Sequence, residues 1–350
     1  MDRRSFLKRA TAFGMAVAFP KVLLRTPSAG LCAKPPLAVN EKLWACLMHL
    51  SFNFAGQIKK YGGLRTAFEP DMSLWNAAVK RMEENHLNML FINLDDSVEW
   101  HCHPEICLKN SWTHEQLRDQ LAQIRKAGIE PIPMLNFSTT HDAWLGKYSK
   151  MVSSAKYYEV CGDLISEAIS LFDTPRFIHF GMDEERIEYQ QQFDFVVIRQ
   201  QEMWWADLYF YIGEAMKRGV RPCIWSDYVW HHPDDFFKMM PKSVVQCNWW
   251  YPEKLSINDV PVRSYLDLTR EGYDVIATGS FDQENPKSIG NTVEFCGDHI
   301  DGSHLLGFMQ TFWKPTIGTY REPILQGIDL IGSARVEYER KRGGKIWEEH

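Results

Sequence analysis

The sequence predicts a single (β/α)₈ barrel, in which eight parallel strands alternate with helices around a closed sheet. Three observations support this fold class. Eight short apolar runs recur along the chain and are nearly continuous, as strands buried on both faces are. Amphipathic segments separate these runs. The 350 residues also suffice for a barrel of roughly 250 residues with loop insertions.

The expected elements follow from these runs and from the residues at their ends. The strands are expected at residues 43–54, 88–96, 129–138, 176–185, 220–228, 243–251, 274–281 and 305–313. The helices with the clearest pattern are expected at residues 72–86, 113–126, 155–172, 199–217 and 323–340. The residues expected to cap the first two of these helices are Asp71 with Ser73, and Thr113 with Glu115. The glycines expected to end helices are Gly128, Gly219 and Gly272.

An open, doubly wound sheet is the alternative fold. Such a sheet typically carries a Gly-rich turn of the form G-x-G-x-x-G after its first strand, where it binds a phosphate. The corresponding stretch offers Gly62 and Gly63, which do not form this pattern. No linker, low-complexity segment or charge run divides the chain. The sequence therefore favours one closed barrel.

Composition and charge exclude several classes of protein. Hydrophobic residues make up 45% and charged residues 24%, which is a globular composition rather than that of a disordered chain or a disulfide-stapled miniprotein. The net charge of −6 and the pI near 6.1 argue against a nucleic-acid partner. The 13 Trp, 13 Tyr and 20 Phe suit a large core, and they also suit a site that stacks against sugars.

Residues 1–33 resemble a twin-arginine export signal. Arg3 and Arg4 precede Phe6-Leu7-Lys8, and a weakly apolar run covers residues 10–24. A basic amphipathic helix is the alternative. Cleavage near residue 33 removes six of the 39 basic and one of the 45 acidic residues, which leaves a mature charge of −11. We expect residues 34–350 to form the barrel domain, periplasmic or secreted, with no membrane insertion after signal removal.

The strand ends identify candidate functional residues, because the chemistry of such barrels lies at the C-terminal ends of their strands. These ends carry carboxylates, amides, hydroxyls and indoles: Ser51, Asn53, Asp95, Asp96, Asn136, Asp183, Glu184, Glu185, Asp227, Trp249, Trp250, Asp282, Glu284, Gln310 and Trp313. No lysine is among them, which disfavours a Schiff-base aldolase.

The fourth expected strand carries the sharpest signal. It ends in three adjacent carboxylates, Asp183, Glu184 and Glu185. Crowded like charges raise the pKa of at least one group, which is what a general acid requires. The alternative is a solvated strand end in which Arg186 is the partner of the carboxylates.

The pattern His179-x-Gly181-x-Asp183-Glu184 resembles the His-x-Gly-Gly-Asp-Glu motif of glycoside hydrolase family 20, the β-N-acetylhexosaminidases. Segments 133–136, 221–227 and 307–313 are similar to other strand ends of that family. The resemblance implies that Glu184 is the general acid and base and that Asp183 holds the substrate's own 2-acetamido group, which attacks the anomeric carbon. It implies that His179 orients this pair.

The resemblance also implies a sugar-binding shell and a glycan as the partner. The expected substrate-binding residues are Asn136, His141, Trp225, Asp227, Trp249, Trp250, Tyr251 and Trp313. Tyr251 or Tyr228 is expected to bind the acetamide oxygen, and each indole also has a plain core interpretation. No cofactor and no metal are implied. The oligomeric state stays open.

The sequence departs from the family pattern around the sugar. Met182 stands where the family has its second glycine. The first strand lacks the family's sugar-binding arginine, for which Arg65 in the next loop is the available substitute. Met134 and Asn136 replace the carboxylates of the third strand, and Lys314 follows Trp313. Sugar identity and linkage therefore stay open.

Three other functions remain as alternatives. His101-Cys102-His103 has the His-x-His spacing of some metal hydrolases, and His141, His179, Asp95 and Asp227 are available as further ligands of a metal-dependent amidohydrolase or deacetylase. A two-carboxylate glycosidase would use Asp227, Asp282 or Glu284 with Glu184. A sugar-binding barrel without catalysis is the third. The residues expected to be core thiols are Cys46, Cys223 and Cys247, and a disulfide between Cys102 and Cys107 is left open.

Overall fold

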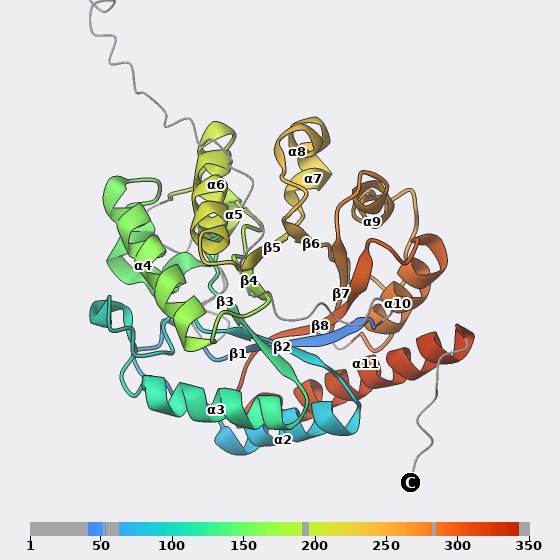
Figure 1. Cartoon of the computed structure of the whole chain (residues 1–350), viewed down its shortest axis with the longest axis horizontal. Helices are drawn as coiled ribbons and strands as arrows, with labels where there is room; N and C mark the ends of the chain where they lie inside the picture. Colours follow the sequence, from blue (N-terminus) through green and yellow to red (C-terminus); the bar gives the residue numbers. More distant parts are fainter. Residues whose placement is uncertain (1–40, 52, 54–62, 191–195, 282–284, 343–350) are drawn as a thin grey trace, which may run out of the picture. The chain divides into compact units, whose positions relative to one another are not determined.

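The computed structural model describes residues 41–51, 53, 63–190, 196–281 and 285–342. Within this part of the chain the strands form one closed parallel barrel in sequence order, with the last strand paired to the first (Figure 1). The strands are β1 (Leu43–His49), β2 (Met89–Asn93), β3 (Glu130–Met134), β4 (Phe177–His179), β5 (Arg221–Trp225), β6 (Val245–Cys247), β7 (Val275–Ser280) and β8 (Leu305–Pro315). The predicted (β/α)₈ barrel is confirmed. The predicted signal, residues 1–33, lies outside the described residues.

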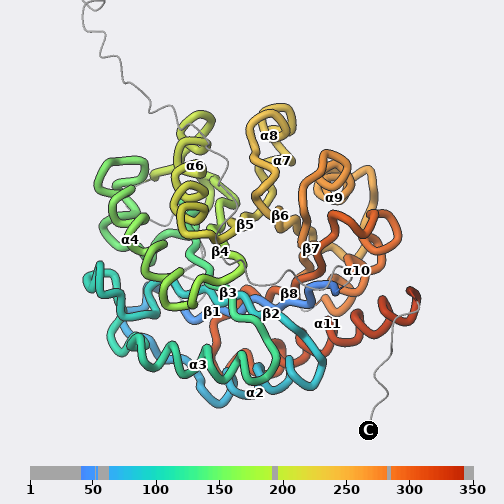
Figure 2. The backbone as a smooth tube through the Cα atoms, in the orientation of Figure 1, coloured from blue at the N-terminus to red at the C-terminus, as the bar shows by residue number. Residues whose placement is uncertain are grey.

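Helices follow the strands and form the outer layer (Figures 1 and 2). The α-helices are α2 (Met72–Glu84), α3 (His114–Lys126), α4 (Ala155–Leu171), α5 (Ile187–Gln190), α6 (Glu202–Met216), α7 (Tyr228–His231), α8 (Pro233–Met239), α9 (Val260–Arg270), α10 (Ser288–His299) and α11 (Arg321–Lys341). The 3₁₀ segments of the described residues are η2 (Pro104–Ile106), η3 (Asp142–Lys150) and η4 (Gly318–Tyr320). No helix in these ranges has the length and apolarity needed to cross a bilayer.

Local sequence signals fix the helix ends. The Asp71 side chain accepts a hydrogen bond from the N–H of Leu74 and caps α2. Thr113 caps α3 in a capping box, but its partner is Gln116 rather than the predicted Glu115. The glycines that follow α3, α6 and α9 have φ values of 76°, 75° and 80°, as the prediction of helix-ending glycines requires: Gly128, Gly219 and Gly272.

Strands β4 and β6 are shorter than predicted, with three residues each. The expected strand 176–185 ends at His179 because the backbone then turns left-handed, with φ of 71° at Gly181, 72° at Met182 and 49° at Glu184. The carboxylates therefore lie on a loop beyond the sheet. Trp225 of β5 and Gln310 within β8 belong to strands, and their side chains are buried.

Alternate residues of each strand face two separate apolar regions, the barrel interior and the layer between strands and helices. Leu43, Ala45 and Leu47 of β1 face the interior, whereas Trp44 and Cys46 face the helices. The thiols predicted to be in the core are buried and free, namely Cys46, Cys223 and Cys247. Cys102 and Cys107 are also free.

Candidate active site

The candidate active site is a group of ionisable side chains at the C-terminal ends of β3, β4 and β5. Asp183 and Glu184 lie in the loop after β4, and Asp227 lies between β5 and α7. His141 lies between β3 and η3, and His179 is the last residue of β4. The parallel strands end at one face of the barrel, so these short loops bring together residues that are far apart in the sequence.

His141 bridges the two adjacent carboxylates. Its Nε2 atom lies 3.3 Å from Oδ2 of Asp183 and 3.6 Å from Oε2 of Glu184. Burial disfavours the charged imidazole, but the two carboxylates outweigh burial and raise the pKa of His141 well above its ordinary value. Burial is the largest single influence on Glu184 and would raise its pKa, but the contact with His141 and the charge of Arg186 together lower it. The imidazole and the two carboxylates thus form one cluster of charged groups.

The loop that presents this pair depends on Gly181. At its φ of 71° a side chain is strained, and a Cβ atom there would lie 1.9 Å from Oδ1 of Asn136. Asn136 is fixed in turn, because its Oδ1 accepts from the N–H of Ser138 and its own N–H donates to Oδ1 of Asp95. Asn136, which the sequence predicts as a sugar ligand, therefore restricts the conformation of the loop after β4 by packing against Gly181.

The backbone of the carboxylate pair is held by side chains from neighbouring loops. The hydroxyl of Ser138 donates to the Asp183 carbonyl, and the hydroxyl of Thr140 donates to the Glu184 carbonyl. The Glu184 N–H donates to Oδ2 of Asp227 at 3.0 Å. Residues of the loops after β3 and β5 thus hold the backbone of the loop after β4. Sequence reasoning missed Ser138 and Thr140, although the polar run that follows Asn136 was the available signal.

Asp227 is a buried carboxyl group with a strongly raised pKa. Burial, and then the negative charge of Asp183, raise its pKa to about 8. Its Oδ1 atom is buried and has no hydrogen-bond partner among the described residues. Asp227 is therefore mostly neutral at pH 7, so the crowding predicted from sequence raises a pKa at Asp227 rather than at Glu184.

The third carboxylate of the run has a structural partner. Glu185 lies 3.0 Å from the buried guanidinium of Arg199, which also pairs with Asp207 of α6 at 2.7 Å. Arg186, the partner expected from sequence, instead lies 3.4 Å from the ring of His231. Glu185 thus belongs to an internal ion-pair network, and the run of three carboxylates divides into the pair bridged by His141 and a residue that anchors the loop.

Four of the predicted aromatic residues gather at the barrel interior and its mouth. The ring centroids of Trp225 and Trp313 lie 5.4 Å apart, and the Trp313 Nε1–H donates to the Tyr251 hydroxyl at 3.1 Å. Trp249 stacks on Tyr251 with a centroid separation of 5.0 Å. The charges of Asp183 and Glu184 act on Tyr251, and its pKa is raised, chiefly by burial.

Two predicted aromatic ligands stand apart from this group of four. Trp250 lies beyond the end of β6 and packs against the core between the strands and the helices, with its ring 6.0 Å from that of Trp230. Tyr228 stacks on Trp204 of α6 with a centroid separation of 4.0 Å, and it also lines a hollow beside Glu184 and Asp227.

His179 is a buried, neutral support. Its Nδ1 accepts the N–H of Gly181 at 3.0 Å, and its ring lies 4.5 Å from that of Trp225. Burial lowers its pKa to about 3. The contact ties the last residue of β4 to the turn that presents the carboxylate pair.

Tyr189 was missed by sequence reasoning, and its hydroxyl lies 3.4 Å from Oε1 of Glu184.

A hollow of about 200 Å³ adjoins Glu184 and Asp227 on the side of α7. Its lining includes Tyr228, His231 and Arg186. On the opposite side of the barrel, Asp96 is a structural residue, since its carboxylate accepts from Ser51 Oγ at 2.6 Å and Asn53 Nδ2 at 2.8 Å. Burial raises the pKa of Asp96 to about 6.

Other candidates from the sequence separate in space. The rings of His101 and His103 have different partners: the His103 ring contacts Glu105 at 3.3 Å and Asp163 at 3.2 Å, away from His101. The His-x-His spacing therefore does not produce a two-histidine chelate. The side chain of Asn53 brackets the backbone of Arg65, accepting from its N–H and donating to its carbonyl. Asp282 and Glu284 lie outside the described residues.

The barrel has close counterparts among solved structures. An exo-β-N-acetylglucosaminidase of glycoside hydrolase family 20 from Vibrio harveyi, in complex with N-acetylglucosamine, matches with a TM-score of 0.55 and 14% identity over 88% of this chain and 59% of that chain. A β-N-acetylhexosaminidase from Bacteroides fragilis matches with a TM-score of 0.57 and 12% identity over 82% of this chain and 65% of that one.

A third counterpart is the N-acetyl-β-hexosaminidase of Streptomyces plicatus, with a TM-score of 0.57 and 12% identity over 88% of this chain and 70% of that one. The likeness establishes a shared fold. This chain spans about three fifths of the length of the Vibrio protein. No family model matches the sequence, and no curated protein is significantly similar to it.

Proposed function

We propose that this protein is a glycoside hydrolase that removes terminal sugars carrying a 2-acetamido group. The observation that carries the proposal is the His141-bridged pair of Asp183 and Glu184 at the C-terminal end of the barrel. The shared fold with family 20 enzymes supports it, as does the aromatic group beside the pair. The acidic residues and the sugar-stacking rings suit a glycan as the partner.

In the proposed reaction Glu184 donates a proton to the glycosidic oxygen while the bond from that oxygen to the anomeric carbon breaks. The carbonyl oxygen of the substrate's acetamido group forms the new bond to the same carbon. Asp183 accepts the acetamido N–H and stabilises the positive charge that develops on that group. Glu184, now a carboxylate, then takes a proton from water, which attacks the anomeric carbon and restores the acetamido group.

The low pKa of Glu184 in the free protein requires a source for the transferred proton. His141 holds that proton, and its Nε2 lies 3.6 Å from the Glu184 carboxylate. Catalytic hydrogen bonds are commonly long in unliganded sites and shorten when substrate binds. His141 and Glu184 together therefore supply one mobile proton, which Glu184 delivers to the substrate. Asp227 is poorly suited to be the nucleophile of a two-carboxylate mechanism, because it is neutral at pH 7 and accepts the Glu184 N–H.

The decisive experiment is hydrolysis of an aryl N-acetyl-β-glucosaminide by the full chain and by two variants. Glu184→Gln should lower kcat by about 10²- to 10⁴-fold and retain sugar binding, because the acid is lost while the shape is kept. Asp183→Asn should slow acetamido substrates much more than plain aryl glycosides. Glu337→Gln, on the exposed face of α11, is the matched control. Full activity of the Glu184→Gln variant would contradict the proposal.

A second candidate function follows from one observation. Ligand atoms of His141, Asp183 and Glu184 lie within 4.8 Å of one another, close enough to hold a divalent cation. A metal-dependent deacetylase acting on the acetamido group would use that arrangement. A chelator distinguishes the two functions. Hydrolysis of the glycosidic bond should persist after chelation, whereas chelator-sensitive release of acetate would favour the deacetylase.

A further inference from the structure

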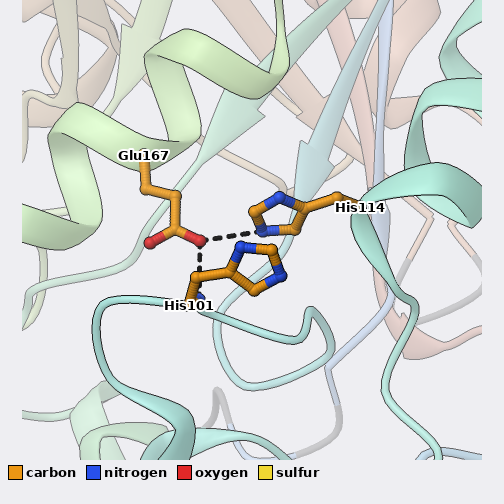
Figure 3. Close-up of side chains that lie close together, drawn as sticks. All are labelled: His101, His114 and Glu167. Atoms are coloured by element: carbon orange, nitrogen blue, oxygen red, sulfur yellow. Dashed lines mark hydrogen bonds and ion pairs between the residues drawn. The ribbon is translucent and has the colours of Figure 1, made fainter.

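A second cluster of metal-binding side chain types lies outside the candidate active site, and no step of the proposed reaction uses it. His101 lies in the loop after β2, His114 is the first residue of α3, and Glu167 lies on α4. Figure 3 shows the two imidazole rings beside the Glu167 carboxylate. Three separate segments therefore converge on one point between the β2–α3 connection and α4.

The distances suit a bound cation. One ligand atom from each of the three residues lies within 4.8 Å of the others. His114 Nε2 lies 2.8 Å from Oε1 of Glu167. Tetrahedral zinc with bonds of about 2.0–2.1 Å separates its ligand atoms by about 3.3 Å. The observed His114–Glu167 pair needs to open by about 0.5 Å, and His101 is exposed, so its ring can turn towards the same centre.

The Glu167 carboxylate is oriented before any ion arrives. Its Oε1 accepts from the His101 backbone N–H at 2.7 Å, and its Oε2 accepts from the Cys102 N–H at 3.0 Å. The imidazole rings of His101 and His114 stack on each other with a centroid separation of 3.7 Å. The carboxylate is therefore held in place beside them, whereas the exposed His101 ring turns to face the ion.

We propose that His101, His114 and Glu167 bind one Zn²⁺ ion, with water as the fourth ligand. Two imidazoles and a carboxylate form a ligand set that suits zinc. The His114 Nε2 offers its lone pair after its proton moves to Nδ1 or to water. The ion links the β2–α3 connection to α4 and stabilises the barrel there. This inference does not depend on the proposed function.

The test is Zn²⁺ binding to the chelator-stripped full chain, followed by calorimetry and by metal analysis after dialysis. We expect one Zn²⁺ per chain and a higher Tm with Zn²⁺ present. His101→Gln and His114→Gln should each weaken binding by at least about 10-fold and remove the Tm shift. His299→Gln, at an exposed histidine of α10, should bind as the unaltered chain does.

Two further measurements separate this site from the active site. Asp183→Asn should retain Zn²⁺ binding, because it alters the other candidate cluster only. With Co²⁺ as the probe, the visible absorption bands of bound Co²⁺ should appear in the unaltered chain and weaken in His114→Gln. His101 is exposed, so His101→Gln reports on binding even if variants at Glu167 fail to fold. Absence of Zn²⁺ binding, or equal binding by His101→Gln and the unaltered chain, would overturn the proposal.

Discussion

At the scale of single residues, the unusual backbone of the loop after β4 is what presents the pair Asp183 and Glu184. Gly181, Met182 and Glu184 all have positive φ, a conformation that costs a side chain roughly 1–2 kcal/mol. This chain has Met182 at the position where the family that it resembles has glycine, so the strain is present here. The buried Sδ of Met182 lies 3.4 Å from the Arg199 guanidinium. The larger side chain therefore packs against the ion-pair network.

Gly181→Ala tests the steric requirement of this loop. The added Cβ would collide with Oδ1 of Asn136, so we expect a loss of about 2 kcal/mol or more in the free energy of unfolding, and a loss of activity because the pair is displaced. Gly219→Ala is the matched control: its φ is 75° and a Cβ there meets nothing within 4 Å. It should cost about 1 kcal/mol. Equal costs in urea unfolding would refute the steric argument.

At the scale of elements, Arg199 joins three segments. Its guanidinium pairs with Glu185 of the loop after β4 and with Asp207 of α6, and it donates to the Phe137 carbonyl after β3. Its side chain is only 2% exposed. A buried charge held by several acceptors stabilises the arrangement only while every partner is present.

Arg199→Gln should therefore lower the free energy of unfolding by about 3–5 kcal/mol, because it leaves the buried carboxylates of Glu185 and Asp207 unpaired. Chemical denaturation would measure the loss. Arg340→Gln removes a guanidinium from an exposed ion pair on α11 and should leave stability essentially unchanged. If both variants unfold at the same denaturant concentration, the network contributes nothing to the loop.

At the scale of the whole molecule, several buried side chains of the barrel have raised pKa values and hold protons in the folded state. Burial raises the pKa of Asp95 and Asp142, as it does for Asp227, and the carboxylates raise that of His141. Each of these groups binds a proton more tightly when folded than when unfolded. Their contribution to stability is complete at low pH and is lost as pH rises.

The free energy of unfolding should therefore fall from pH 6.5 to pH 8, by about 1–2 kcal/mol for Asp227 alone. His49 and His179, with a folded-state pKa of about 3, act in the opposite direction, because the unfolded chain still protonates them in part at pH 6.5. Their effect is smaller, about 0.4 kcal/mol each over this window. Asp227→Asn should reduce the drop, and urea titrations at the two pH values measure it. A stability that rises over this interval would contradict the raised pKa of Asp227.

The amino-acid sequence by itself determined the barrel, the helix caps and the carboxylate pair, because hydrophobic periodicity and capping residues act over a few neighbouring positions. The export signal in residues 1–33 stays a prediction from sequence. Sequence patterns singled out Asp183 and Glu184 because both stand in one motif, but they could not place the side chain of Trp250, which lies beyond the end of β6.

Only the tertiary structure decided which groups share protons and which anchor the loops. Arg199, rather than Arg186, pairs with Glu185, and Asp227, rather than Glu184, holds the raised pKa. The same holds for His101, whose ring meets His114 rather than His103. Charge pairing and desolvation depend on distances of a few ångströms between segments that are far apart in the chain, and those distances are set by the closure of the barrel.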